Sequence, residues 1–362
     1  MSNNNLFDKI KQSFSNWLIS LPIKTLSDQI QYAFSQLREV DTILTDIRRL
    51  DATLSESDLA DIGKKAYAAA DKYGQNVTDY LSTVRSLTQA GYKNAAELAD
   101  LTLSLQNAGD LTADLAQTYI TAADHAYDLN GNIRQLRTTL DGANNISNLN
   151  AVNLSDLAAG MDTVGARAAD AGVQIDEVTA AIGTMTAAAD ISGADAGNAF
   201  QDILNHLSSS SLSDSSLQTP MEQLASMADT YQNLAADSRE RTSILSLLGT
   251  EDDQAAIDAL LSNWNLYQTM LSEYATGGGS ISEEAALTAD SWESSTNRLQ
   301  NSWVNFIDTL VDQDAIVGTT NALSDLLNGI ASITDTVGAL PPLIAGVTAI
   351  LGQDKLLCPI WQ

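Results

Sequence analysis

The chain has few of the residues from which compact sites and cross-links are built. Its 362 residues include one cysteine, Cys358, and two histidines, His125 and His206. A single cysteine cannot form an internal disulfide, which excludes a secreted disulfide scaffold. Two histidines far apart in the sequence, with one cysteine, do not match the ligand spacing of a structural zinc site. We therefore expect no metal site.

Basic residues are also scarce. The chain carries 18 Lys and Arg against 46 Asp and Glu, a formal net charge of −28 at pH 7. Such a surface repels phosphates, so we expect no direct nucleic-acid binding. The charge is uneven: residues 1–100 have a net charge of −2 and residues 101–362 a net charge of −26. The asymmetry indicates either a polarised partner or environment, or a surface that is acidic for solubility alone.

Long hydrophobic runs are missing as well. No stretch reaches the ~18 uninterrupted apolar residues of a standard transmembrane helix. The polar start, Asn3 to Asn5, does not suit a signal peptide. Two apolar stretches near the ends still suit membrane contact: one helical face in residues 6–21, and residues 337–351, which Pro341-Pro342 interrupt. For the first stretch, packing against neighbouring helices is the alternative.

Proline is almost absent from the interior, with none between Pro22 and Pro220. Few stretches alternate with the period of a strand, and many show the three-to-four spacing of an amphipathic helix. One apolar stripe close to a heptad pattern consists of Leu26, Ile30, Phe34, Leu37, Val40, Leu44 and Ile47. The sequence predicts an all-α protein with little or no β structure. Many short antiparallel helices would form a compact core, beside longer amphipathic, coiled-coil-like helices.

Capping residues and glycines predict the helix ends. A Ser-x-x-Asp box at Ser55 predicts a start, and Gly74 and Gly91 predict ends. We expect Asp141-Gly142 to end another helix, followed by a loop or domain joint in the asparagine-rich residues 144–153. The predicted helices cover residues 56–73, 77–90, 94–108, 112–129, 133–140, 155–171, 176–189, 195–207, 220–238, 239–249, 251–275 and 282–311.

Composition divides the chain into six expected segments. These are N-terminal amphipathic and coiled-coil-like helices (1–54), a helical core (55–207), a serine-rich linker (208–218), a helical hairpin region (219–276), a long tryptophan-containing helix with a following helix (277–335), and an apolar tail with a truncated look (336–362).

No stretch of the sequence matches the residue spacing of a known catalytic or ligand-binding motif. A phosphate-binding loop ending at Lys64 would need glycine at position 58, where Asp58 stands. The stretches 128–132 and 190–195 resemble calcium loops, but they lack the glycine and glutamate of that motif, and capping or turn formation explains them better. Glu283-Glu284 suits a helix N-terminus. We predict a non-enzymatic protein with no catalytic, cofactor-binding or metal-binding residues.

Several motifs follow one another along the chain. They are Ala90-Gly-Tyr-Lys-Asn-Ala-Ala-Glu-Leu, Ala108-Gly-Asp-Leu-Thr-Ala-Asp-Leu-Ala, Asn148-Leu-Asn-Ala-Val-Asn-Leu-Ser-Asp-Leu-Ala, Gly172-Val-Gln-Ile-Asp-Glu, Ser192-Gly-Ala-Asp-Ala-Gly-Asn-Ala-Phe and Ala289-Asp-Ser-Trp-Glu-Ser-Ser. In this order they resemble the core region of bacteriophage tail tape measure proteins, and the resemblance covers about residues 35–335.

The resemblance implies a structural protein of the virion tail lumen, made in the host bacterial cytoplasm. It would set tail length and act as a scaffold for tail-tube assembly. Its partners would be the tail-tube (major tail) protein, tail-assembly chaperones and further copies of itself. It would leave with the DNA at ejection and contact the host membrane through its apolar termini.

Two features keep alternatives open. Family members are usually longer, so the end at residues 356–362 predicts a truncated product or a non-functional prophage remnant. A helical binding module of a secreted effector or toxin has the same composition and remains a second hypothesis. A helical enzyme is the third.

Overall fold

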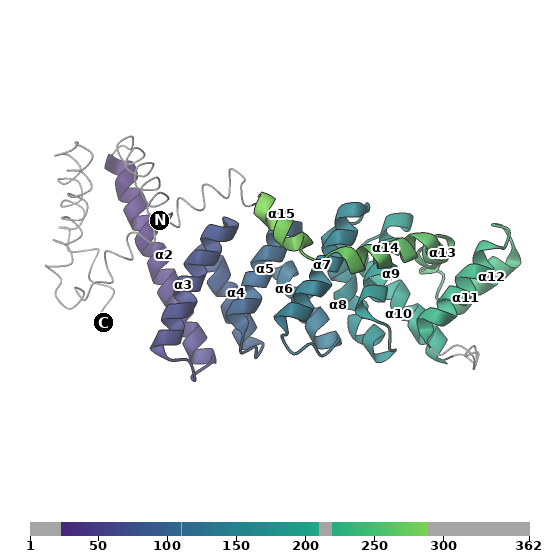
Figure 1. Ribbon diagram of the computed structural model, residues 1–362, viewed down its shortest axis with the longest axis horizontal. Coiled ribbons are helices and arrows are strands. Elements are labelled where there is room, and N and C mark those ends of the chain that lie inside the picture. Colours follow the sequence, from purple (N-terminus) through teal and green to yellow (C-terminus); the bar gives the residue numbers. More distant parts are fainter. Residues whose placement is uncertain (1–22, 110, 210–218, 289–362) are drawn as a thin grey trace. The chain divides into compact units, whose positions relative to one another are not determined.

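The computed structural model describes residues 23–109, 111–209 and 219–288, and throughout these residues the structure is helical, without a strand (Figure 1). The all-α prediction is therefore confirmed. The chain divides into two units, residues 1–45 with 298–362, and residues 46–297. Most of the described residues belong to the second unit. The division into six segments stays a prediction.

The described helices, in chain order, are α2 (Ile23–Leu50), α3 (Glu56–Tyr73), α4 (Val77–Gln89), α5 (Ala95–Gly109), α6 (Ala113–Ala126), α7 (Ile133–Leu149), α8 (Leu154–Asp170), α9 (Ile175–Ala189), α10 (Gly193–Ser209), α11 (Pro220–Gln232), α12 (Arg239–Leu248), α13 (Gln254–Ser262), α14 (Trp264–Thr276) and α15 (Ser280–Thr288).

Helix α2 has the apolar stripe that the sequence predicts. Its side chains are described from Ser35 onward, and Val40, Ile43 and Ile47 are buried at steps of three and four residues. The stripe differs from the expected one at a single step: Ile43 is buried and Leu44 is half-buried. Leu37 is half-buried, and the members before it, Leu26, Ile30 and Phe34, lie outside the described side chains.

In the second unit, helices α3 to α10 pack on their neighbours in the chain or on the next helix but one. Contacts join α4 to α3 and α5, and they join α8 to α6, α9 and α10. After α10 the chain passes through α11 and α12 and then turns back. Helix α13 packs on α9 and α10, α14 on α9 and α7, and α15 on α7 and α5 (Figure 1). The last three helices thus retrace the array as a return strap, a name used below for α13–α15.

Local caps fix several helix ends as predicted. The hydroxyl of Ser55 accepts a hydrogen bond from the N–H of Asp58, whose carboxylate accepts from the N–H of Ser55. Gly74 ends α3 in the left-handed region at φ 66°. Pro220 occupies the first turn of α11, after the capping residue Thr219.

Three predicted helix starts were wrong by one or two positions. The sequence predicts starts at the capping residues Ser155, Asp176 and Asp195, but helices α8, α9 and α10 begin at Leu154, Ile175 and Gly193. In α10 the hydroxyl of Ser192 accepts from the N–H of Asp195, and it also bonds the Asp195 carboxylate. Asp176 and Asp195 therefore lie inside the first turn, where their negative charge interacts favourably with the positive end of the helix dipole.

The predicted loop at residues 144–153 was also wrong. Helix α7 runs through Asp141 and Gly142 to Leu149, so residues 144–149 of the predicted loop are helical. Gly142 does not end α7; it allows α7 to pack closely against helix α14. A Cβ at Gly142 would be 2.6 Å from the ring of Tyr274 on α14. Close packing, and not a turn, explains this glycine.

Other predicted bounds shift as well. Helix α6 ends at Ala126, since Asp128 and Asn130 take positive φ angles of 50° and 54°. The predicted helix 251–275 is divided at Asn263, whose side chain donates to the carbonyl of Ala259 at 2.8 Å. Helix α11 ends at Gln232, before the predicted 238. Helix α15 begins two residues before the predicted 282.

Several predictions fall outside the described residues. They concern the helical face in residues 6–21, most of the serine-rich linker, the tryptophan-containing helix beyond residue 288, and the apolar residues 337–351. Among the helices that the structure describes, none is long and apolar enough to span a membrane.

Candidate functional site: the polar face of helix α7

The histidines considered in the sequence lie on different helices. His125, in the last turn of α6, places Nε2 3.2 Å from the hydroxyl of Tyr92, and the two rings stack. Tyr92 donates to the buried carboxylate of Asp124 at 2.7 Å. Its own burial, and then the bond to Asp124, raise the pKa of Tyr92. His206 lies in the last turn of α10, as predicted.

The two calcium-like stretches form turns and helix caps, as predicted. Asp190 ends α9 in the left-handed region at φ 54°. In the other stretch, the N–H of Gly131 donates to Asp124 at 2.7 Å. Within the described ranges, no three His, Cys, Asp or Glu side chains are grouped so that they could hold a metal ion.

An extended polar network lies along α7, where the sequence predicted a loop. Its members on α7 and at its end are Asp141, Asn144, Asn145, Asn148 and Asn150, named here the α7 polar face. Every member bonds to a residue between 273 and 284, in α14, α15 or the turn between them. The face thus joins segments that are more than 120 residues apart.

Asp141 caps α15 from the side of another helix. Its carboxylate accepts from the N–H of Gly279 at 2.9 Å and from that of Ile281 at 3.1 Å. Its backbone carbonyl accepts from the hydroxyl of Ser280 at 2.8 Å. The side chain is buried, with 4% of Asp141 exposed. A buried carboxylate needs such donors, and the positive end of the α15 dipole adds to its compensation.

The asparagine amides hold the strap on either side of that cap. Asn144 and Asn148 donate to the carboxylate of Glu284 at 2.9 and 2.7 Å. Asn145 donates to the backbone carbonyl of Glu273, and Asn150 to its carboxylate, both at 2.7 Å. Hydrogen bonds to charged acceptors are stronger than those between neutral groups. The face therefore fixes the position of both helices of the strap that meet at residues 277–279.

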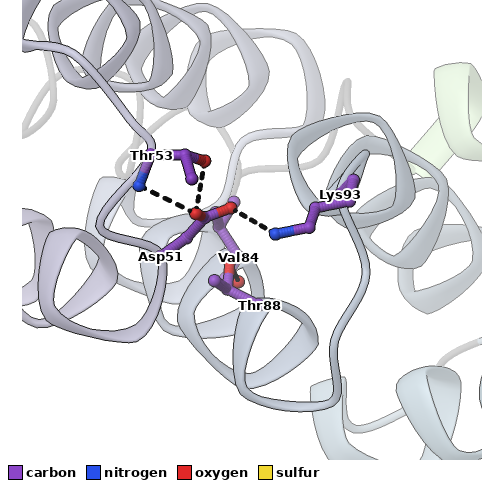
Figure 2. Close-up of polar contacts among 5 residues, drawn as sticks. All are labelled: Asp51, Thr53, Val84, Thr88 and Lys93. Carbon is purple, nitrogen blue, oxygen red and sulfur yellow. Dashed lines mark hydrogen bonds and ion pairs between the residues drawn. The ribbon is translucent and has the colours of Figure 1, made fainter.

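A second polar junction ties the start of the second unit together. Figure 2 shows the carboxylate of Asp51 between Thr53 and Lys93. It accepts from the N–H of Thr53 at 3.1 Å and from Lys93 Nζ at 2.9 Å. The hydrogen bonds of Thr53, and next the bond from Lys93, lower the pKa of Asp51 to about 2. The junction joins the α2–α3 loop to the segment between α4 and α5.

Ion pairs follow the uneven charge of the sequence. Six ion pairs join described side chains within residues 46–100. Further along, Asp141 and Glu284 are compensated by N–H donors of amides instead. Two carboxylates even meet there: burial, and then a hydrogen bond with Asp253, raise the pKa of Asp202. The acidic part of the chain is thus held together with few cations.

A family model for phage-related minor tail proteins matches residues 64–262. This chain belongs to that family. The matched region begins within α3 and ends with α13, so it contains the α7 polar face but not α14 and α15, which bind to it. As a minor tail protein, the chain has a structural role in a phage tail and belongs to the virion tail. No solved structure matches the chain significantly.

The sequence contained a signal for the α7 polar face that our prediction did not use. Asp141, Asn144, Asn145 and Asn148 follow each other at the spacing of one helix face. We interpreted the asparagines by their low helix propensity. The residues that they bind lie so far along the chain that the partners could not be predicted from spacing.

Proposed function

We propose that this minor tail protein is a tail-length ruler and a scaffold on which the tail tube assembles. Two observations support the proposal. The family match covers residues 64–262, and the ordered motifs between Ala90 and Phe200 fall within it. The family match is the observation that carries the proposal, and the motifs point within the family to tape measure proteins.

Helical structure suits a ruler because it converts residue number into length. An α-helix rises ~1.5 Å per residue, so 362 residues placed end to end as helix would reach at most ~540 Å. In the proposed role, the chain lies in the tail lumen while tail-tube subunits polymerise around it. Tail-assembly chaperones keep it assembly-competent in the host cytoplasm, and it associates with further copies of itself.

The charge distribution suits a conduit that DNA later passes. Residues 101–362 carry a net charge of −26, which disfavours adhesion to the DNA phosphates. We propose that the protein leaves the tail with the DNA at ejection and contacts the host membrane through residues 6–21 and 337–351. A mobility-shift titration with duplex DNA at physiological salt tests whether the acidic residues 101–362 avoid binding DNA. Measurable affinity for the duplex would contradict this.

The ruler role is tested by altering the gene in the phage or prophage that encodes the chain. Deleting the gene should abolish tails or make their lengths irregular. An in-frame duplication of α2, 28 residues, should lengthen the tail by ~42 Å at a helical rise of ~1.5 Å per residue, measured by negative-stain electron microscopy. Gly278→Ala, which keeps the residue number, is the matched control. Intact particles with an unchanged tail length after the duplication would contradict the ruler role.

A further inference from the structure

Helix α15 buries little apolar surface. Of its nine residues, Ile281 and Ala285 are buried, whereas Leu287 is 77% exposed. Helix α9 differs sharply, because every residue from Val178 to Thr186 is buried. Since apolar burial is the main force that holds helices in a core, α15 is weakly held by this term.

Polar contacts with α7 add to the attachment of α15. Asp141 binds Gly279 and Ile281, Asn144 binds Glu284, and Arg137 Nη1 donates to the hydroxyl of Ser282 at 3.2 Å. On undocking, water can replace these partners, so such bonds oppose release less than an equal area of apolar contact would.

A glycine segment separates α15 from α14. Gly277 is fixed, because a Cβ there would lie 2.5 Å from the carbonyl of Asp141. Gly278 and Gly279 have open space around a Cβ, and Gly279 has a φ of 93°. Glycine adopts both signs of φ readily, so the chain can pivot at these two positions without moving α14.

Helix α15 covers an apolar helix. It packs chiefly against α5 and α7. Helix α5 runs from Ala95 to Gly109 and buries eleven residues, Leu98, Leu101, Leu103 and Leu105 among them. A departure of α15 would therefore bare part of α5 to solvent.

We propose that α15 is a releasable latch. It undocks from α5 and α7 as a unit, pivoting at Gly278 and Gly279, while α3–α10 stay folded, and its release exposes the covered side of α5. The latch does not depend on the ruler role, because it rests only on contacts within residues 46–288.

Hydrogen exchange of the full chain, read by mass spectrometry, tests the latch. Amides of residues 280–288 should exchange at least ~10-fold faster than those of α9, at a rate independent of global unfolding. Asp141→Asn should speed exchange in residues 279–288 by a further ~10-fold and leave α9 unchanged. A Glu-specific protease should then cut at Glu283 and Glu284 sooner than elsewhere.

Asp156→Asn is the matched control. Asp156 on α8 accepts from the N–H of Gly193, the first residue of α10, at 2.9 Å, so it caps a core helix in the same way. This variant should affect α10 and not release α15 selectively. Equal protection of α15 and α9 in the wild-type chain would overturn the proposal. So would an Asp141→Asn variant that folds but loses protection equally in both helices.

Discussion

Gly193 lies directly on the backbone of Asp156, where α10 begins against α8. Its N–H donates to the Asp156 carboxylate, and a Cβ at this position would overlap the Asp156 backbone carbonyl. Gly197, one turn later, is similarly close to the carbonyl of Gly160, at 2.9 Å from a Cβ. The two helices approach this closely because Gly160 on α8 and both Gly193 and Gly197 on α10 lack a side chain at the contact.

Gly193→Ala should therefore destabilise the protein. The backbone of Asp156 cannot give way as a flexible side chain would, so α10 must shift, at a cost of about 2–3 kcal/mol in the free energy of unfolding. Urea denaturation followed by circular dichroism measures the loss. Gly278→Ala is the control, since a Cβ there meets nothing within 4 Å. It should stay within ~0.5 kcal/mol of wild type. Equal stability of the two variants would show that α8 and α10 are farther apart.

The pKa of Asp51 makes one part of the stability depend on pH. The folded value of about 2 lies below the ordinary value of 3.8, so this carboxylate stabilises the folded state fully above ~pH 4. The contribution is lost as the pH falls from ~4 through ~2. Asp51→Asn should lower Tm at neutral pH, and the difference from wild type should shrink as the pH approaches ~2.

Asp61→Asn is the control for the Asp51 experiment. Asp61 is exposed on α3 and makes no hydrogen bond or ion pair within the part of the chain that the structure describes. Its replacement should change Tm little at any pH. Thermal melts by circular dichroism between ~pH 7 and ~pH 2 measure both variants. A Tm difference for Asp51→Asn that stays constant with pH would contradict the bonds to Thr53 and Lys93.

The contact between Gly142 and Tyr274 predicts a coupled pair. Gly142→Ala should cost about 1–3 kcal/mol, because the new methyl group displaces the tyrosine ring. In a Tyr274→Ala background the same change should cost nothing, or gain up to ~1 kcal/mol from helix propensity. A double-mutant cycle by urea denaturation gives the coupling. Additive effects would mean that α7 and α14 do not meet at this point.

These residues also show which parts of the structure could be predicted from the sequence. Ser55 and Gly74 act on their immediate neighbours, so the limits of α3 follow from local chemistry alone. Gly142 and Asn144 act on residues more than 120 positions away. Out of context, such residues favour a turn, and tertiary packing overrides that preference. The helices were therefore predictable, but the α7 polar face and the strap that it binds were not.

Two buried tyrosines should respond oppositely to loss of the hydroxyl. Tyr80 and Tyr119 are 1% and 0% exposed. Tyr80 donates to the carbonyl of Ala96 at 2.8 Å, whereas the hydroxyl of Tyr119 has no hydrogen-bond partner among the described residues. Tyr80→Phe should cost about 1 kcal/mol, the net worth of a typical hydrogen bond. Tyr119→Phe should be neutral or stabilise the fold by up to ~1 kcal/mol, because it removes a buried polar group. Urea denaturation of both variants decides the matter. An equal loss in both would mean that Tyr119 finds a partner in solution.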